Sequence, residues 1–359
     1  ALTKNFLSIN LLWKMFTLGP VCGEGFLDRE ELVEEMVDTL SSPAERTGFA
    51  LVGKRRMGKT SVFLEVVRRL REAPGIVPVY FSLWELVEPT PEGFARGVVR
   101  SALEAFQECG ALPLRVRARN LLNAPLELLR DILREVRISV RLREELELLL
   151  VLGQGQRRGD PGELIARAFR FPDSLAADVG VRCALFLDEF PSILELRGNG
   201  KTLGEGVVRR LRTEYERMEA LILSISGSVR STMEAVVLDA GSAFWRQFVV
   251  REVGPLPPEA VQELFRRNLG RELPERAFAA VWEFTRGIPF YVQFLGRELA
   301  RRGKKIGPAE VEEAVEEFLR EEGDVLFREE LQRLSPKERK IVLALAQGTV
   351  SYTHLTLPT

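Results

Sequence analysis

The segment Gly53–Thr60 has the residue types and the spacing that bind a phosphate chain. Its letters, GKRRMGKT, match the pattern G-x-x-x-x-G-K-[ST]. The apolar run Phe49–Val52 before it predicts a strand, and the apolar spacing of Thr60–Leu70 after it predicts a helix. A loop in this position offers backbone N–H groups and a helix N-terminus to phosphate. The other interpretation is a structural glycine-rich turn with exposed basic residues, which the flanking elements disfavour.

The loop implies a bound triphosphate together with Mg²⁺. Its glycines let backbone amides surround the β-phosphate, Lys59 is expected to bridge the β- and γ-phosphates, and the Thr60 hydroxyl is expected to hold Mg²⁺. The residues of this segment expected to bind nucleotide are Gly53, Lys54, Arg55, Arg56, Met57, Gly58, Lys59, Thr60 and Ser61.

An acidic pair follows the apolar run Ala184–Leu187, which is typical of a central buried strand. Asp188 is expected at the carboxyl edge of the sheet, where it holds Mg²⁺ through water. Glu189 is expected to polarise the attacking water as a general base. Such a pair also suits the first turn of a helix, and it is the phosphate loop that favours the catalytic interpretation. A water-activating carboxylate favours hydrolysis over transfer to a small-molecule acceptor.

Residues beside two further predicted strands have roles that the sequence leaves open. The predicted strand Leu221–Ile225 ends in small polar residues, and Ser226 or Ser228 either bonds the γ-phosphate or the attacking water or forms an ordinary turn. Arg246 precedes the predicted strand Phe248–Val250 and is either an arginine finger, in its own or a neighbouring subunit, or a structural arginine. The expected catalytic residues are Lys59, Asp188, Glu189, Ser228 and Arg246.

The whole chain predicts an α/β fold with a helical second part. Up to about residue 254, strand-length apolar runs, of which Val77–Leu83 is another, alternate with helix-period segments. This alternation is typical of a parallel sheet with helices on both faces. Residues 111–160 are expected to be a helical insertion in this core. From residue 255 onward only helices are predicted, at 258–268, 274–285, 289–302, 308–322 and 336–346, which indicates a separate helical domain.

Composition excludes several classes of protein. The 359 residues include 51 Lys and Arg against 52 Asp and Glu, so binding of nucleic acid by bulk charge is excluded. Three cysteines and one histidine are too few for a disulfide framework, a zinc cluster or a Ser-His-Asp triad. No window has the roughly 18 apolar residues that span a membrane. We therefore expect a cytoplasmic protein with no membrane partner.

Both ends of the sequence are expected to be foreign to the domains. Residues 1–14 are interpreted as a non-native or upstream leader, with Met15 as a candidate start. The apolar run Phe6–Trp13 is too short to span a bilayer, and no signal-peptide cleavage site follows it. Residues 349–359 are interpreted as an adapter-derived tail, because Val350–Thr359 looks like a translated sequencing adapter.

Taken in this order, the motifs resemble the archaeal-type P-loop ATPases of the AAA+/STAND group, which are relatives of the origin-recognition ATPases. The resemblance covers roughly residues 18–348 and adds Gly19–Val21, Phe26–Glu30 and Gly287–Pro289 to the motifs above. It implies a five-stranded P-loop core of residues 15–254 with strand order 5-1-4-3-2. It also implies that Arg29 lies against the nucleotide base and that Pro289 packs near the adenine.

The resemblance further implies a helical lid over residues 255–325 and the truncated start of a winged helix over 326–348. Such proteins are Mg²⁺-dependent ATP-hydrolysing switches that couple nucleotide state to the lid and to a C-terminal effector or DNA-binding domain. The implied partners are DNA through the winged helix, a protein effector, or a second copy of the chain. The alternative function is a nucleotide-binding scaffold with little turnover.

One charged stretch stays open between two interpretations. From Arg115 to Arg143 there are eight arginines against three acidic residues. They form either a nucleic-acid or partner surface or solvated helix faces with i,i+4 ion pairs, and the absence of aromatic residues favours the second.

Overall fold

The computed structural model describes residues 16–346, apart from 113–137, 154–159, 199, 229–232, 234–235, 238, 304–305, 324–326, 329–330 and 332–333. The chain forms two compact units. The sheet unit comprises Thr17–Ala260 and Ile288–Phe290, and the helical unit comprises Phe16, Val261–Gly287 and the chain from Tyr291 onward. Most of the helical insertion expected over 111–160, and most of its arginine-rich stretch, lies outside the described residues.

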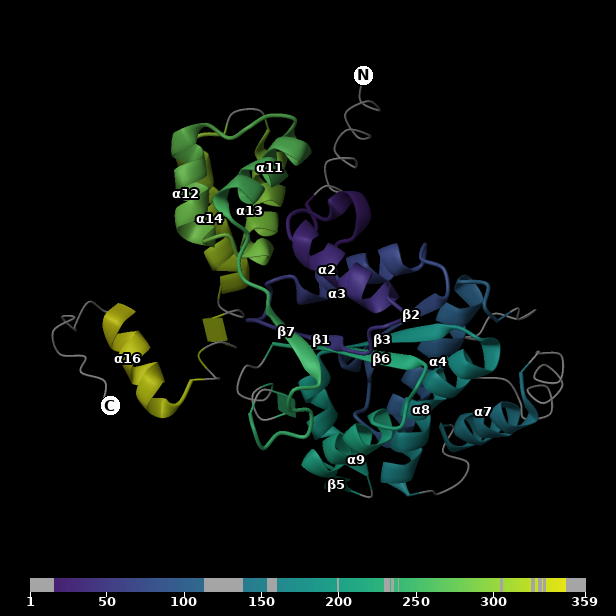
Figure 1. The fold of residues 1–359 in the computed structure, drawn as a ribbon. Coiled ribbons are helices and arrows are strands. Elements are labelled where there is room, and N and C mark those ends of the chain that lie inside the picture. The colour runs from purple at the N-terminus through teal and green to yellow at the C-terminus, as the bar shows by residue number, and fades with distance from the viewer. Residues whose placement is uncertain are drawn as a thin grey trace. The chain divides into compact units, whose positions relative to one another are not determined.

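A five-stranded parallel sheet organises the sheet unit (Figure 1). Across the sheet the strands lie in the order β2-β3-β6-β1-β7. Numbered one to five along the chain, this order is 2-3-4-1-5, which reads 5-1-4-3-2 from the other edge. All five predicted strands are confirmed, each with ends within two residues of the expected ones. Their bounds are β1 Gly48–Val52, β2 Ile76–Ser82, β3 Arg182–Asp188, β6 Leu221–Gly227 and β7 Phe248–Glu252.

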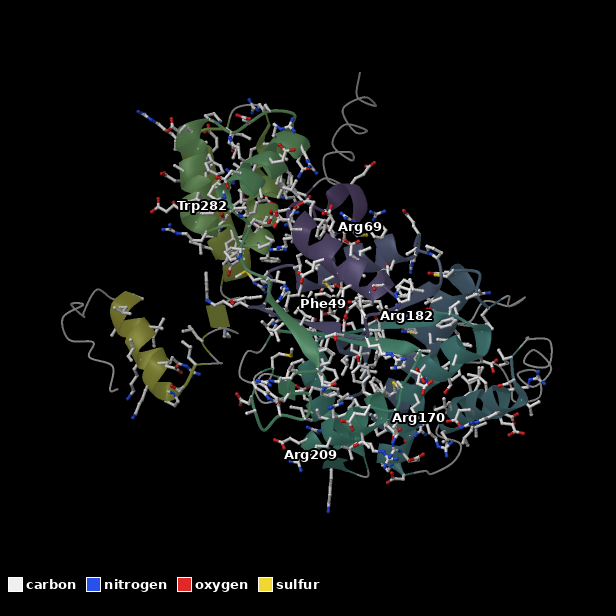
Figure 2. All side chains as sticks on the ribbon, viewed as in Figure 1. Phe49, Arg69, Arg170, Arg182, Arg209 and Trp282 are labelled. Atoms are coloured by element: carbon white, nitrogen blue, oxygen red, sulfur yellow. The ribbon has the colours of Figure 1, made fainter. Side chains whose placement is uncertain are left out.

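Both faces of the sheet are buried, because side chains alternate along each strand. In β3, Leu185 and Leu187 face one apolar cluster, while Ala184 and Phe186 face the other. The second face is covered by α2 (Glu30–Ser41) and α3 (Lys59–Leu70), and the apolar cluster on the first face includes residues of four helices (Figure 1). These four are α4 (Pro91–Glu108), α7 (Val140–Gly153), α8 (Pro161–Val179) and α9 (Glu205–Tyr215). Figure 2 shows Phe49 inside this unit and Arg209 at its periphery.

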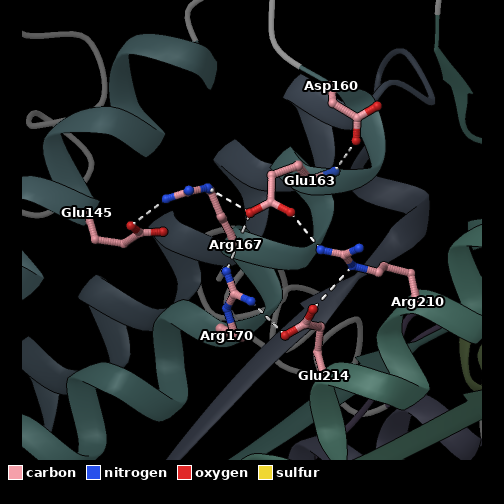
Figure 3. A network of polar contacts seen from close by, with 7 residues as sticks. All are labelled: Glu145, Asp160, Glu163, Arg167, Arg170, Arg210 and Glu214. Carbon is pink, nitrogen blue, oxygen red and sulfur yellow. Dashed lines mark hydrogen bonds and ion pairs between the residues drawn. The ribbon is translucent and has the colours of Figure 1, made fainter.

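Ion pairs join α7, α8 and α9 beneath the sheet (Figure 3). Arg167 of α8 reaches Glu145 of α7 at 2.8 Å, and Arg170 of α8 reaches the buried Glu214 of α9 at 2.7 Å. Arg210 of α9 completes the network by pairing with Glu163 at 2.6 Å and with Glu214 at 3.1 Å. The three helices are therefore held in one layer by charge as well as by apolar packing.

Short elements connect these layers. The turns η1 (Gly23–Gly25), η2 (Leu83–Glu85) and η3 (Phe190–Glu195) are 3-10 helices. A two-stranded hairpin is formed by β4 (Arg197–Gly198) and β5 (Lys201–Thr202). Of these, η2 follows β2 directly and η3 begins immediately after Glu189, so both lie at the carboxyl edge of the sheet.

The helical unit contains the helices that the sequence predicts, apart from the first residues of α11 (Pro258–Leu269) and α13 (Pro289–Arg302), which belong to the sheet unit. The others are α12 (Glu275–Thr285), α14 (Pro308–Phe318) and α16 (Pro336–Ala346). The helix expected over 308–322 is α-helical only to Phe318 and continues as a π-helix, Leu319–Gly323. An aromatic cluster supports this unit, with the ring centroids of Phe294 and Phe318 4.6 Å apart. None of the helices in the described part of the chain is long and apolar enough to cross a membrane.

A buried carboxylate fixes the chain that precedes α2. Glu65 of α3 is 2% exposed, accepts a hydrogen bond from the backbone N–H of Gly23 at 2.7 Å, and pairs with Arg68 and Arg69. The hydrogen bond from Arg68 is the largest cause that lowers the pKa of Glu65 from 4.5 to about 2. The charged form of Glu65 therefore stabilises the fold.

Replacing Glu65 with Gln should lower the free energy of unfolding by about 2 kcal/mol at pH 7. Because the pKa of Glu65 is lowered on folding, the difference from the wild type should narrow as the pH falls from 4.5 towards 2. Urea unfolding of both proteins at pH 7 and pH 3 measures this difference in the free energy of unfolding. Glu72→Gln, at the exposed partner of Arg68, is the matched control and should cost little. An equal effect of Glu65→Gln at both pH values would contradict this account.

Candidate active site

The loop between β1 and α3 requires both of its glycines. Gly53 has φ +148° and Gly58 has φ +86°, which are backbone conformations that glycine adopts without strain. A Cβ on Gly53 would lie 2.4 Å from the carbonyl oxygen of Val253, and one on Gly58 would lie 2.7 Å from Nη1 of Arg29. The loop is thus packed tightly against the chain that follows β7 and against the start of α2.

Lys59 closes this loop from the first turn of α3. Its Nζ donates hydrogen bonds to the carbonyl oxygens of Gly53 at 2.9 Å and Lys54 at 3.0 Å. The side chain is nearly buried, and this burial lowers the pKa of Lys59, while the negative charges of Glu189 and Asp188 act in the opposite direction. An anion bound in the loop would meet a poorly hydrated ammonium group that the backbone holds in place.

Asp188 and Thr60 meet although they are 128 residues apart in the chain. The Thr60 hydroxyl donates to Oδ2 of Asp188 at 2.7 Å. The hydroxyl of Tyr80 donates to the same oxygen at 2.8 Å, and the hydroxyl of Ser226 donates to Oδ1. Asp188 is 2% exposed, so these three hydroxyls, from α3, β2 and β6, fix the direction in which its carboxylate points.

Glu189 lies beside this carboxylate in a strained position. Its backbone has φ +50°, in the left-handed region that a residue with a side chain seldom adopts. The Ser228 hydroxyl donates to Oε2 of Glu189 at 2.9 Å, and the Ser228 N–H donates to the same oxygen at 3.3 Å. Burial raises the pKa of Glu189, and the charge of Lys59 and the Ser228 hydrogen bonds oppose that rise. Ser228 therefore acts on the carboxylate that the sequence predicts as the base.

The oxygen donors of the site suit Mg²⁺. The Thr60 hydroxyl and the Asp188 carboxylate are hard ligands of the kind that Mg²⁺ prefers. Within the described ranges no cluster of three or more His, Cys, Asp or Glu residues could hold a metal ion. A site with two protein oxygens fits an ion that commonly completes its shell with phosphate and water.

The middle of the loop is held by aromatic and apolar contacts. The guanidinium carbon of Arg55 lies 4.9 Å from the ring centroid of Trp84, and that of Arg56 lies 4.3 Å from the ring centroid of Phe290. Met57 is buried in the apolar cluster of α2 and α3, whereas Lys54 is exposed. The loop is therefore fixed to the apolar cluster through Met57, and the three basic residues Lys54, Arg55 and Arg56 precede this point.

The remaining nucleotide-binding candidates, Arg29, Pro289 and Ser61, lie in different surroundings. Arg29, with φ +70° at the start of α2, donates from Nη2 to the carbonyl oxygen of Gly254 at 2.7 Å. Burial is the main cause that lowers the pKa of Arg29, which lies against Gly58 of the loop. Pro289 begins α13 and is half-buried in the sheet unit. The hydroxyl of Ser61 accepts a hydrogen bond from the N–H of Val21 at 3.1 Å, so its described contact is with protein.

Arg246 is not brought to this edge of the sheet. It precedes β7, whose first residue, Phe248, pairs in parallel with Gly48 at the start of β1. Arg246 therefore lies at the amino edge, opposite the edge where the phosphate loop begins after Val52. It is exposed and stacks near the ring of Trp245 at 5.6 Å. Arg246 therefore does not lie at the edge of the sheet that carries the phosphate loop of its own chain.

The sequence motifs do not single out Tyr80, and the sequence offers Ser226 and Ser228 as alternatives, whereas in the structure both serines contact the acidic pair. Tyr80 contacts Asp188, while Ser226 holds Asp188 and Ser228 holds Glu189. Tyr80 stands out as the one hydroxyl in the apolar run Val77–Phe81. A polar residue near the carboxyl end of a buried strand is a signal that could have identified it.

Comparisons with known proteins agree with this geometry. The Walker-type ATPase paby2304 of Pyrococcus abyssi is similar over 93% of this chain and 84% of that chain, with 19% identity and a TM-score of 0.62. The ORC1 protein of Aeropyrum pernix, solved in complex with DNA, is similar over 94% and 75%, with 14% identity and a TM-score of 0.50. No protein-family model and no curated sequence matches the chain. The chain thus has the fold of the archaeal-type P-loop ATPases related to the origin-recognition ATPases.

Proposed function

We propose that this protein binds ATP together with Mg²⁺ and hydrolyses the bond to the γ-phosphate. The observation that carries the proposal is the 2.7 Å hydrogen bond between Thr60 and Asp188. It unites a hydroxyl at the start of the helix after the glycine loop with a carboxylate at the end of a buried strand. The likeness of the fold to a Walker-type ATPase supports the same activity.

The phosphate chain is proposed to lie in the loop Gly53–Gly58. The backbone N–H groups of this loop and the N-terminus of α3 offer positive partial charge, and the Lys59 ammonium adds a full charge. Thr60 and Asp188 would hold Mg²⁺, which when bound neutralises charge on the phosphates. Arg29, against Gly58, and Pro289 are proposed to line the side of the site that takes the base.

Glu189 is proposed to prepare the attacking water. Its carboxylate accepts the proton of a water whose oxygen attacks the γ-phosphorus, while the bond to the β-γ bridging oxygen breaks and ADP leaves. Ser228 fixes the direction of this carboxylate through its two hydrogen bonds. Burial, which raises the pKa of Glu189, makes it a stronger base than a solvated carboxylate.

Hydrolysis is further proposed to act as a switch of the AAA+/STAND type. The helices of residues 255–325 are proposed as the lid, and α16 as the first helix of a winged domain that takes DNA. Four apolar side chains of α16 are exposed by 38–46%, as expected of a helix that a larger domain covers: Ile341, Val342, Leu343 and Leu345. The similar ORC1 protein was solved in complex with DNA, which supports that class of partner. Arg246 is proposed to act on the nucleotide of a neighbouring copy.

Replacing Lys59 with Ala should weaken ATP binding about 100-fold, because a nearly buried cation that faces the phosphates is lost. Isothermal titration calorimetry with Mg²⁺ and ATP measures the dissociation constant. Lys201→Ala, at an exposed lysine of β5, is the matched control and should bind as the wild type does. If the Lys59 variant binds ATP as tightly as the wild type does, the phosphate chain does not bind in this loop.

Replacing Glu189 with Gln should lower the rate of phosphate release about 100- to 1000-fold, because the amide cannot accept the proton of water. ATP affinity should stay within about threefold, since the amide keeps the size of the side chain. Phosphate release and calorimetric binding, measured on the same preparation, separate the two effects. If the wild type and the variant release phosphate equally slowly while both bind ATP, the protein is a nucleotide-binding scaffold.

A further inference from the structure

Trp84 is an exposed aromatic residue at the edge of the sheet that carries the site. It belongs to η2, which follows β2 directly, and the last residue of β2, Ser82, pairs in register with Asp188. Its side chain is 54% exposed, so the apolar core does not explain its position. The contacts that hold it come instead from two parts of the candidate site.

The first contact is with the phosphate loop, and the second is with the chain that follows the acidic pair. Arg55 places its guanidinium carbon 4.9 Å from the centroid of the Trp84 ring. The indole N–H of Trp84 donates to the hydroxyl of Ser192 in η3 at 3.2 Å. The backbone N–H of Ser192 in turn donates to the carbonyl oxygen of Glu189 at 3.0 Å. One indole therefore connects the loop to the turn that begins at Glu189.

A bound triphosphate would change the first of these contacts. A cation over an indole face gains about 0.5–2 kcal/mol, whereas phosphate oxygens within the loop would attract the same guanidinium by charge-assisted hydrogen bonds. Arg55 belongs to the loop Gly53–Gly58, in which the phosphate chain is proposed to lie. Movement of Arg55 towards phosphate would release the indole, and through Ser192 would alter how the turn at Glu189 is held.

We propose that Trp84 is a positioning residue that couples occupancy of the phosphate loop to the placement of Glu189. This inference rests on the proposed ATPase function and deepens it. Trp84 acts through Ser192 and Arg55, without contact to the reacting atoms. A matched pair exists in the same unit, because Arg246 lies near the ring of Trp245 at 5.6 Å, but at the amino edge of the sheet.

Tryptophan fluorescence of the whole chain tests the coupling. The chain has four tryptophans, and a non-hydrolysable ATP analogue with Mg²⁺ should change the emission of the wild type. The change should vanish in Trp84→Phe and persist in Trp245→Phe, because Trp84 stacks on Arg55 of the loop whereas Trp245 lies at the amino edge of the sheet. An unchanged response in Trp84→Phe would overturn the proposal.

Kinetics test whether the coupling positions the base. Trp84→Ala removes both contacts and should lower kcat about tenfold, with KM within about threefold of the wild type. Trp84→Phe keeps a ring for Arg55, so its kcat should fall less than that of Trp84→Ala. The fall should be about the same as in Ser192→Ala, because both variants lose the hydrogen bond between Trp84 and Ser192. Unchanged kcat in Trp84→Ala and Ser192→Ala would sink the inference.

The two proposals fail in different ways. Calorimetry on the wild type shows whether ATP binds at all, and if it does not, the ATPase function and the role of Trp84 both fall. If the wild type binds and hydrolyses ATP while every Trp84 variant matches it in emission and kcat, only the role of Trp84 is lost. Because Trp84 is exposed, thermal unfolding of its variants should match the wild type and confirm that they fold.

Discussion

The contact between Thr60 and Asp188 depends on the parallel direction of the strands. Because β1 and β3 run the same way, the loop after one and the acid at the end of the other reach the same edge, with β6 between them. Thr60 then extends from the first turn of α3 to Oδ2 of Asp188. A reversed β3 would place Asp188 at the far edge, and the loop would bind an anion with no carboxylate nearby. The layer of α2 and α3 on one face keeps this alignment by burying Phe49, Leu51 and Phe186.

The same site also concentrates charge where little water reaches. Lys59, Asp188 and Glu189 are each at most 8% exposed. Burying any of them alone would be unfavourable, but opposite charges and donated hydrogen bonds compensate. Tyr80 and Ser226 satisfy Asp188, Ser228 satisfies Glu189, and loop carbonyls satisfy Lys59. Groups held in this way need little rearrangement when a phosphate chain arrives, which is how fixed dipoles and charges favour a reaction.

Much of this arrangement could be predicted from the sequence, because its signals are local. Strands buried on both faces, such as Arg182–Asp188, appear as continuous apolar runs, and the glycine loop has a fixed spacing. Other contacts depend on strand register and side-chain rotamers, which cannot be read from a single sequence. They are the contact of Tyr80 with Asp188, that of Ser226 with Asp188 and that of Ser228 with Glu189. From the sequence, Arg246 is either an arginine finger or a structural arginine. Its distance from the loop follows from the direction of β7, which must start at the amino edge.

A crystal structure with Mg²⁺ and a non-hydrolysable ATP analogue would show directly whether the loop and the Thr60–Asp188 pair form the nucleotide site. We expect the β-phosphate against the backbone N–H groups of Gly53–Gly58 and the metal ion between Thr60 and Asp188. The Thr60 hydroxyl would then have turned from the carboxylate to the metal. An analogue bound elsewhere on the chain, with Thr60 still donating to Asp188, would show that this loop is not the nucleotide site.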